Sequence, residues 1–214
     1  MITIGVLNLQ GAVSEHLEVT KKAIEKMKLN NEISKINKIN VDNENIEIEV
    51  KAVRFADEVA KCQGIIISGG ESTVIGKLME ERGISKVIKE NNISVFGTCA
   101  GMVLLSKEID YNQPTLGLMD ISVKRNSFGS QKNSFEKEIQ ILGNSFQGVF
   151  IRAPAVIEAK NNVEVLSKIH QSYDQDSIIA VKQGNHIAMA FHPELTDDTR
   201  LHEYYLKELL NSLK

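Results

Sequence analysis

Cysteine is scarce in this chain, and its sequence has neither long apolar stretches nor an excess of positive charge. The two cysteines, Cys62 and Cys99, are too few for a disulfide framework, which favours a reducing compartment. No apolar stretch approaches the ~20 residues of a membrane-spanning helix, and the first residues lack the basic and apolar regions of a signal peptide. The formal net charge of −3 argues against binding to nucleic acid. We therefore expect a cytoplasmic protein with neither a membrane nor a nucleic acid as partner.

The pattern of apolar residues predicts a single α/β domain over residues 1–214. The first half alternates short apolar strands with segments of helical periodicity, which is typical of a mostly parallel sheet with helices on both faces. The second half is richer in strand patterns. We expect strands at 2–7, 46–50, 65–67, 93–96, 119–124, 138–142, 149–152, 163–169, 177–182 and 187–191. We expect helices at 13–27, 73–81, 85–91 and 102–105, and a last helix capped by residues 196–198.

Two features of the first half carry no chemistry of their own. Residues 29–45 are rich in Asn and Lys and poor in large apolar side chains, which is typical of a surface insertion. A contact with a partner is the alternative for this segment. Cys62 lies just before the strand predicted at 65–67, and we expect it to be a structural thiol or one without a role.

The segment Gly97-Thr98-Cys99-Ala100-Gly101 joins a strand pattern to a helical pattern. Small residues around one nucleophilic side chain are typical of a strand–turn–helix elbow, because glycines allow the backbone to turn sharply. The elbow would place the Cys99 thiol at the carboxyl edge of the sheet, with the free N–H groups of the next helix directed at the sulfur. Such surroundings stabilise a thiolate. A buried cysteine between two tightly packed glycines is the alternative.

A histidine and a carboxylate lie together at the end of another apolar strand. His192 follows the strand predicted at 187–191, and Pro193 and Glu194 come directly after it. The carboxylate of Glu194 can turn back to the far ring nitrogen of His192, which would orient the ring and stabilise its charged form. A cysteine nucleophile needs a base and a group that orients the base, so the pairing with Cys99 favours catalysis over an exposed turn.

A third strand end carries the turn Gly69-Gly70-Glu71-Ser72. If this turn lies beside Cys99, the backbone N–H groups of Gly70 and Ala100 can form an oxyanion hole. A Gly-Gly turn that only leads into a helix is the alternative. The turn is not a phosphate-binding P-loop, because the Lys and the Ser or Thr that end such a loop are missing. No group of His, Cys and Asp has the spacing of a zinc site, so we expect no metal.

Together these three motifs resemble those of the class I, or triad, glutamine amidotransferases. The segments 5–13, 117–120, 125–131 and 150–154 narrow the resemblance to the glutaminase subunits of pyridoxal 5′-phosphate synthases. It spans nearly the whole chain and departs mainly at 29–45. It implies a three-layer, flavodoxin-like α/β fold with a mostly parallel central sheet and helices on both faces.

The resemblance also implies a role for each matching residue. Cys99 matches the nucleophile, His192 the general base and acid, and Glu194 the orienting carboxylate. The matching positions for binding L-glutamine are Gly70, Glu71, Ser72, Arg125, Ile151 and Arg152. A guanidinium suits the α-carboxylate of glutamine, although a structural ion pair is the alternative for any single arginine. Gln10 matches a residue near the oxyanion hole and the subunit interface.

The implied activity is hydrolysis of L-glutamine to L-glutamate and ammonia through a cysteine thioester. The ammonia would pass to a separate (β/α)₈-barrel synthase subunit that makes pyridoxal 5′-phosphate (vitamin B6). That compound would be the product of the complex, so we expect no cofactor in this chain. Two alternatives stay open: a glutaminase that serves a histidine- or purine-pathway synthase, and a binding module of the same fold that has lost catalysis.

Overall fold

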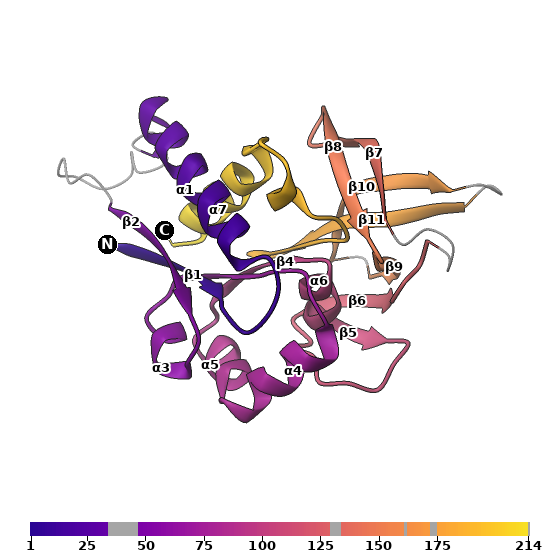
Figure 1. Ribbon diagram of the computed structural model, residues 1–214, viewed down its shortest axis with the longest axis horizontal. Coiled ribbons are helices and arrows are strands. Elements are labelled where there is room, and N and C mark those ends of the chain that lie inside the picture. The colour runs from indigo at the N-terminus through magenta and orange to yellow at the C-terminus, as the bar shows by residue number, and fades with distance from the viewer. Residues whose placement is uncertain (34–46, 129–133, 161, 172–174, 214) are drawn as a thin grey trace.

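The computed structural model describes residues 1–33, 47–128, 134–160, 162–171 and 175–213 (Figure 1). The helices and strands of the first half are β1 (Ile2–Leu7), α1 (Val13–Leu29), β2 (Ile48–Val53), α3 (Ala56–Val59), β3 (Gly64–Ile67), α4 (Ser72–Glu81), α5 (Ile84–Glu90), β4 (Ser94–Thr98) and α6 (Ala100–Leu105). Those of the second half are β5 (Ser106–Ile109), β6 (Met119–Lys124), β7 (Ser134–Ile141), β8 (Asn144–Ile151), β9 (Ala155–Ala159), β10 (Glu164–Gln171), β11 (Gln175–Gln183), β12 (His186–Met189), the 3₁₀ turn η1 (Pro193–Leu195) and α7 (Arg200–Ser212).

One large sheet organises the described residues. Its strand order is β2-β1-β3-β4-β12-β11-β9-β6-β5, with β10 also paired to β11. The strands β2, β1, β3, β4 and β12 are mutually parallel, whereas β11 is antiparallel to β12. The hairpin β7–β8 forms a separate small sheet. The predicted α/β fold with a mostly parallel central sheet is confirmed.

Helices cover both faces of the parallel part of the sheet. Figure 1 shows α1 and α7 on one side and α3, α4 and α5 on the other. Each long helix buries an apolar stripe against the strands, because residues three and four apart share one helix face. The buried residues of α7, for example, include Leu201, Tyr205 and Leu209. The strand β3 between these layers consists of buried residues throughout, as expected for a parallel strand covered on both faces.

The order of the strands places the three sequence motifs side by side. The strands β3, β4 and β12 are neighbours, with Ile67 opposite Gly97 and Met189 opposite Thr98. Each motif follows the carboxyl end of one of these strands. The carboxyl edge of a parallel sheet, where neighbouring strands end together, is the usual place for a site in such folds.

Several local expectations need correction. The strands β5 and β9 and the single-turn helix α3 are missing from the sequence prediction because each is only four or five residues long. The last helix begins at Arg200 with Thr199 as its N-cap, so the predicted cap at 196–198 is wrong. Pro193 instead starts the 3₁₀ turn η1, which ends before Thr196.

The segment 29–45 lies mostly outside the described residues. Its described part begins at the end of α1, where Glu32 forms an ion pair with Lys207 of α7 at 2.7 Å. Ile33 is buried in the core, with 6% of its surface exposed. The start of this segment is therefore packed against the domain, while its role as an insertion stays a prediction.

The elbow between β4 and α6 depends on close packing of backbone against backbone. A Cβ atom on Gly101 would lie 2.3 Å from the carbonyl oxygen of Ile67, and one on Gly97 would lie 2.6 Å from that of Gly101. Both distances are far below van der Waals contact, so only glycine allows α6 to approach β3 and β4 this closely.

We expect Gly101→Ala to lower the free energy of unfolding by about 3 kcal/mol, because the added methyl group overpacks the elbow. Denaturant unfolding followed by circular dichroism measures this change. Gly143→Ala is the matched control: nothing lies within 4 Å of its Cβ position, and only the positive φ costs about 1 kcal/mol. Equal losses in the two variants would contradict the close-packing account.

Candidate active site

Cys99 has a strained backbone at the junction of strand and helix. Its φ is +49° and its ψ is −101°, a region that costs a residue with a side chain on the order of 1–3 kcal/mol. The backbone N–H of Cys99 donates to the carbonyl of Met189 at 2.8 Å, which fixes the elbow to β12. The predicted strand–turn–helix is therefore present, and the thiol lies at the edge of the sheet with 9% of the residue exposed.

His192 and Glu194 form a buried pair beside this elbow. Nδ1 of His192 lies 2.7 Å from Oε1 of Glu194, and both residues are less than a tenth exposed. Gly69 lies against the imidazole, because a Cβ there would be 2.2 Å from Cε1 of His192. The backbone N–H of His192 donates to the carbonyl of Val149 at 2.8 Å. The backbone of His192 is thus held by β8, and its ring packs against the glycine turn.

The surroundings of His192 favour its protonated form. Burial by itself would lower the pKa of His192, but Cys99 and the carboxylate of Glu194 outweigh it and raise this pKa to about 10. Nε2 of His192 is buried and makes no hydrogen bond within the described residues. Cys99 raises the pKa of His192 through its nearness to the ring, although Sγ and Nε2 form no hydrogen bond of good geometry within the described residues.

The glycine turn after β3 is linked to the loop after β1. The backbone N–H of Glu71 donates to Oε1 of Gln10 at 2.8 Å, and Oγ of Ser68 donates to the carbonyl of Gln10 at 3.1 Å. Since α6 packs directly on the end of β3, the first N–H groups of α6 and the turn at Gly70 lie at neighbouring strand ends. Gln10, Gly70 and Ala100 thus occupy one region of the sheet edge.

Arg125 is joined to the glycine turn through a residue that the sequence did not single out. Gln113 accepts hydrogen bonds at Oε1 from Oγ of Ser72 at 3.0 Å and from Nη1 of Arg125 at 3.3 Å. The same guanidinium lies 3.6 Å from Oε1 of Glu71 and stacks over the ring of Tyr111. Gln113 and Tyr111 belong to an irregular loop without a motif, so no sequence signal points to them.

Ile151 and Arg152 approach the site from the hairpin β7–β8. The carbonyl of Ile151 lies 3.7 Å from Sγ of Cys99 and accepts its hydrogen bond. Arg152 follows with an exposed side chain and a φ of +44°. The strand β8 therefore reaches Cys99 from a different sheet than β4 and β12.

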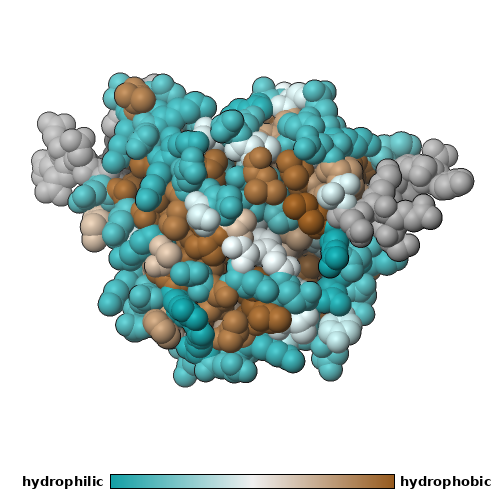
Figure 2. All heavy atoms as spheres, in the orientation of Figure 1, coloured by the Kyte–Doolittle hydropathy of each residue, from teal (hydrophilic) through white to brown (hydrophobic). Residues whose placement is uncertain are grey.

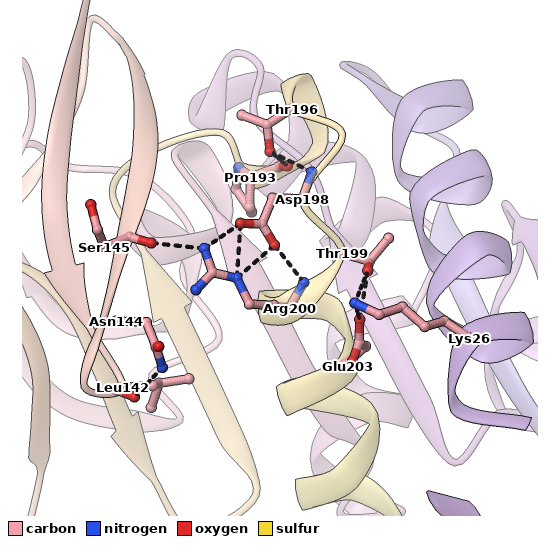
Figure 3. A network of polar contacts seen from close by, with 10 residues as sticks. All are labelled: Lys26, Leu142, Asn144, Ser145, Pro193, Thr196, Asp198, Thr199, Arg200 and Glu203. Carbon is pink, nitrogen blue, oxygen red and sulfur yellow. Dashed lines mark hydrogen bonds and ion pairs between the residues drawn. The ribbon is translucent and has the colours of Figure 1, made fainter. Parts of the chain in front are cut away.

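Arg200 fastens this hairpin to the segment that carries Glu194. Figure 3 shows Arg200 between the hairpin and the start of α7, where Nη2 donates to the carbonyl of Ser145 at 2.7 Å and Nε donates to Asp198 at 2.9 Å. The backbone N–H of Asp198 in turn donates to Oγ1 of Thr196 at 3.3 Å. These bonds connect the start of β8 to the segment that follows Glu194.

The described residues offer no arrangement of three or more His, Cys, Asp or Glu side chains that could hold a metal ion. Cys62 lies elsewhere, and burial raises the pKa of its thiol to about 11. The thiol of Cys62 therefore stays protonated at neutral pH, which matches a structural residue.

A mostly parallel sheet with cysteine, histidine and glutamate at its carboxyl edge is the architecture of a class I glutamine amidotransferase. The sequence model of the SNO glutamine amidotransferase family matches residues 6–211, so the chain belongs to that family.

Similar proteins agree with this assignment. The chain is 59% identical over 217 residues to the pyridoxal 5′-phosphate synthase subunit PdxT of Methanobrevibacter smithii, and 100% of both chains is covered. It is 55% identical over 214 residues to the PdxT of Methanothermobacter thermautotrophicus, again with 100% of both covered. A crystal structure of a glutamine amidotransferase superposes with a TM-score of 0.77 at 38% identity, covering 96% of this chain and 98% of that one. The resemblance inferred from the motifs is confirmed.

We expect Glu194→Gln to lower the pKa of His192, because the change removes a charge that raises it. An NMR titration of the histidine side chains measures this: the wild-type imidazolium persists beyond pH 8, and the variant titrates earlier. The pKa of His192 in the folded protein, about 10, exceeds the ordinary value of 6.5. Protonation of His192 therefore contributes to the stability of the folded protein, fully below pH 6.5 and less and less as the pH rises towards 10. His202, whose pKa burial lowers to about 3, is an internal reference. An unchanged titration of His192 would contradict this account.

Proposed function

We infer that this chain is the glutaminase subunit of a pyridoxal 5′-phosphate synthase. It hydrolyses L-glutamine to L-glutamate and ammonia and supplies the ammonia to a synthase subunit. Membership of the SNO family over residues 6–211 and the 59% identity to a PdxT protein support this function. The observation that carries the chemistry is the convergence of Cys99, His192 and Glu194 at neighbouring strand ends.

In the proposed mechanism, Cys99 attacks the side-chain carbonyl of glutamine. The developing oxyanion accepts hydrogen bonds from the backbone N–H groups of Gly70 and Ala100, which lie at the adjoining ends of β3 and β4. The carbon–nitrogen bond of the tetrahedral intermediate then breaks, and His192 donates the proton that lets nitrogen leave as ammonia. A γ-glutamyl thioester on Cys99 remains.

The same histidine serves the second half of the reaction. After giving up its proton, neutral His192 takes one from water, and the resulting hydroxide attacks the thioester. The carbon–sulfur bond breaks, releasing glutamate and the Cys99 thiolate, with the ring of His192 protonated again. Glu194 keeps the ring in place through the 2.7 Å contact to Nδ1. The raised pKa of His192 supports this role, because the ring begins each cycle as an acid.

The residues around the cysteine suit the remaining parts of glutamine. Arg125 is proposed to bind the α-carboxylate, with Glu71 at 3.6 Å to hold the guanidinium. Ser72 and Gln113 extend the same hydrogen-bond network. Ile151 and Arg152 are proposed to line the opposite side from β8, and Gln10 to support the turn that carries Gly70. These roles follow from the positions that match the family.

Ammonia is useful only if it reaches its acceptor, so the partner is part of the function. We propose a (β/α)₈-barrel as the fold of the synthase subunit and the cytoplasm as the compartment. In the part of the chain that the structure describes, no helix is long and apolar enough to cross a membrane. Apolar side chains gather near the middle of one face (Figure 2). Such a surface suits contact with a protein partner.

The two alternative functions, another pathway's glutaminase and a binding module without catalysis, have less support. A glutaminase for the histidine or purine pathway would share the fold and the triad, but PdxT proteins resemble this chain over its full length. A binding module without catalysis would have no need for a buried His–Glu pair beside a strained cysteine. The glutaminase is therefore favoured on both counts.

We expect Cys99→Ala to lower glutamine hydrolysis by at least about 10³-fold when measured with the synthase subunit present, because it removes the nucleophile. Cys62→Ala is the matched control, since Cys62 is a buried thiol far along the chain from the triad. Release of glutamate and ammonia is measured for both variants. Activity near the wild-type level in Cys99→Ala would exclude this mechanism.

A further inference from the structure

Two histidines that the mechanism above does not use lie buried directly behind Glu194. His16 belongs to α1 and His202 to α7, and both are fully buried. Nδ1 of His16 lies 3.0 Å from Nε2 of His202. Nε2 of His16 lies 3.3 Å from Oε2 of Glu194 and 3.1 Å from Oγ1 of Thr98. A continuous line of polar contacts therefore runs from His202 through His16 and Glu194 to His192.

Both added histidines are neutral at physiological pH. Burial, followed by the neighbouring His202 and His192, holds the pKa of His16 well below its ordinary value, and burial lowers that of His202 to about 3. A neutral imidazole carries one N–H and one lone pair. In each of these two histidines, one ring nitrogen can therefore donate a hydrogen bond and the other can accept one.

The contacts allow only one arrangement without an unpaired donor. Nδ1 of His202 has no hydrogen-bond partner within the described residues, so a proton there would be a buried donor costing about 1–3 kcal/mol. His202 therefore carries its proton on Nε2 and donates to Nδ1 of His16. His16 must then carry its own proton on Nε2, which faces Oε2 of Glu194 and the hydroxyl of Thr98.

The second carboxylate oxygen of Glu194, Oε2, lies beside this N–H, which also forms a hydrogen bond with Oγ1 of Thr98. Oε1 of Glu194 is occupied by His192, whereas Oε2 is buried and has no hydrogen-bond partner in the described part of the chain. Its contact with Nε2 of His16 at 3.3 Å is therefore electrostatic, between the carboxylate charge and the N–H dipole. A buried carboxylate oxygen without a donor is costly, because charge is poorly solvated in the interior. With Oε2 unheld, the carboxylate could rotate about its terminal bond and lose the alignment of Oε1 with His192.

We propose that His16 is a positioning residue for the glutaminase reaction: its Nε2–H, 3.3 Å from Oε2 of Glu194, stabilises that oxygen electrostatically, and His202 fixes the tautomer that puts the proton on Nε2. The inference deepens the proposed function and rests on its triad. His16 touches neither Cys99 nor the substrate in this scheme, so its effect reaches the reaction only through Glu194 and His192.

The test compares three variants by their steady-state glutaminase kinetics in the complex with the synthase subunit. His16→Leu removes the donor at similar volume, and His16→Gln restores an N–H near the position of Nε2. We expect His16→Leu to lower kcat about 10- to 100-fold, with KM for glutamine within about twofold, because Glu194 does not bind the substrate. We expect His16→Gln to recover most of kcat.

His186→Leu is the matched control for the loss of a buried histidine. His186 lies on β12, is 8% exposed, and accepts the backbone N–H of Val95 at Nδ1, away from the triad. We expect this variant to be less stable than the wild type, with kcat within about twofold of it. If His16 had only a structural role, His16→Leu and His186→Leu would have similar kcat values when kcat is calculated per folded protein.

The outcomes separate this inference from the proposed function. If Cys99→Ala is inactive but His16→Leu keeps wild-type kcat, the triad stands and the positioning role is wrong. An equal loss of kcat in His16→Leu and His16→Gln also overturns the positioning role, because only the second variant restores an N–H. If His16→Leu does not fold, the variant His202→Leu provides the test. It removes the donor to Nδ1 of His16, so the proton of His16 is no longer confined to Nε2, and we expect kcat to fall about tenfold. An unchanged kcat in His202→Leu would overturn the proposal.

Discussion

The backbone contact between α6 and the end of β3 is the constraint on which the site depends. Gly101 lies against the carbonyl of Ile67, so the helix after Cys99 begins directly beside the glycine turn that follows β3. The bond from the N–H of Cys99 to Met189 fastens the same elbow to β12. Three strand ends are thereby fixed with respect to one another, and the strained φ of Cys99 is held by the packing around it.

Polar and charged contacts connect Glu194 to the two helices α1 and α7. The carboxylate of Glu194 faces His192 on one side and neutral His16 on the other. Further out, Lys26 of α1 lies 2.7 Å from Glu203 of α7, so the two helices that supply His16 and His202 are tied together. The packing of α1 on α7 therefore contributes to the site, although neither helix carries a residue of the proposed triad.

The sequence predicts the parts of the site that depend on contiguous residues. Glycine-flanked Cys99, the pair His192 and Glu194, and the turn at Gly70 each follow a strand pattern, and the rule that parallel strands end at one edge brings them together. Gln113 and the histidine pair have no such signal. Their roles arise from contacts between α1, α7 and an irregular loop, which single-sequence periodicity does not determine. The short strands β5 and β9 are missed because four or five residues carry too little pattern.

The central claim is that Cys99, among the two cysteines of the chain, is the residue that attacks the glutamine side chain. The most direct measurement is to treat the complex with a glutamine analogue that carries an electrophile at its side-chain carbonyl, and to locate the adduct by peptide mass spectrometry. We predict one adduct per chain, on Cys99, formed more slowly when L-glutamine competes. An adduct on Cys62, or labelling that glutamine does not slow, would contradict the account.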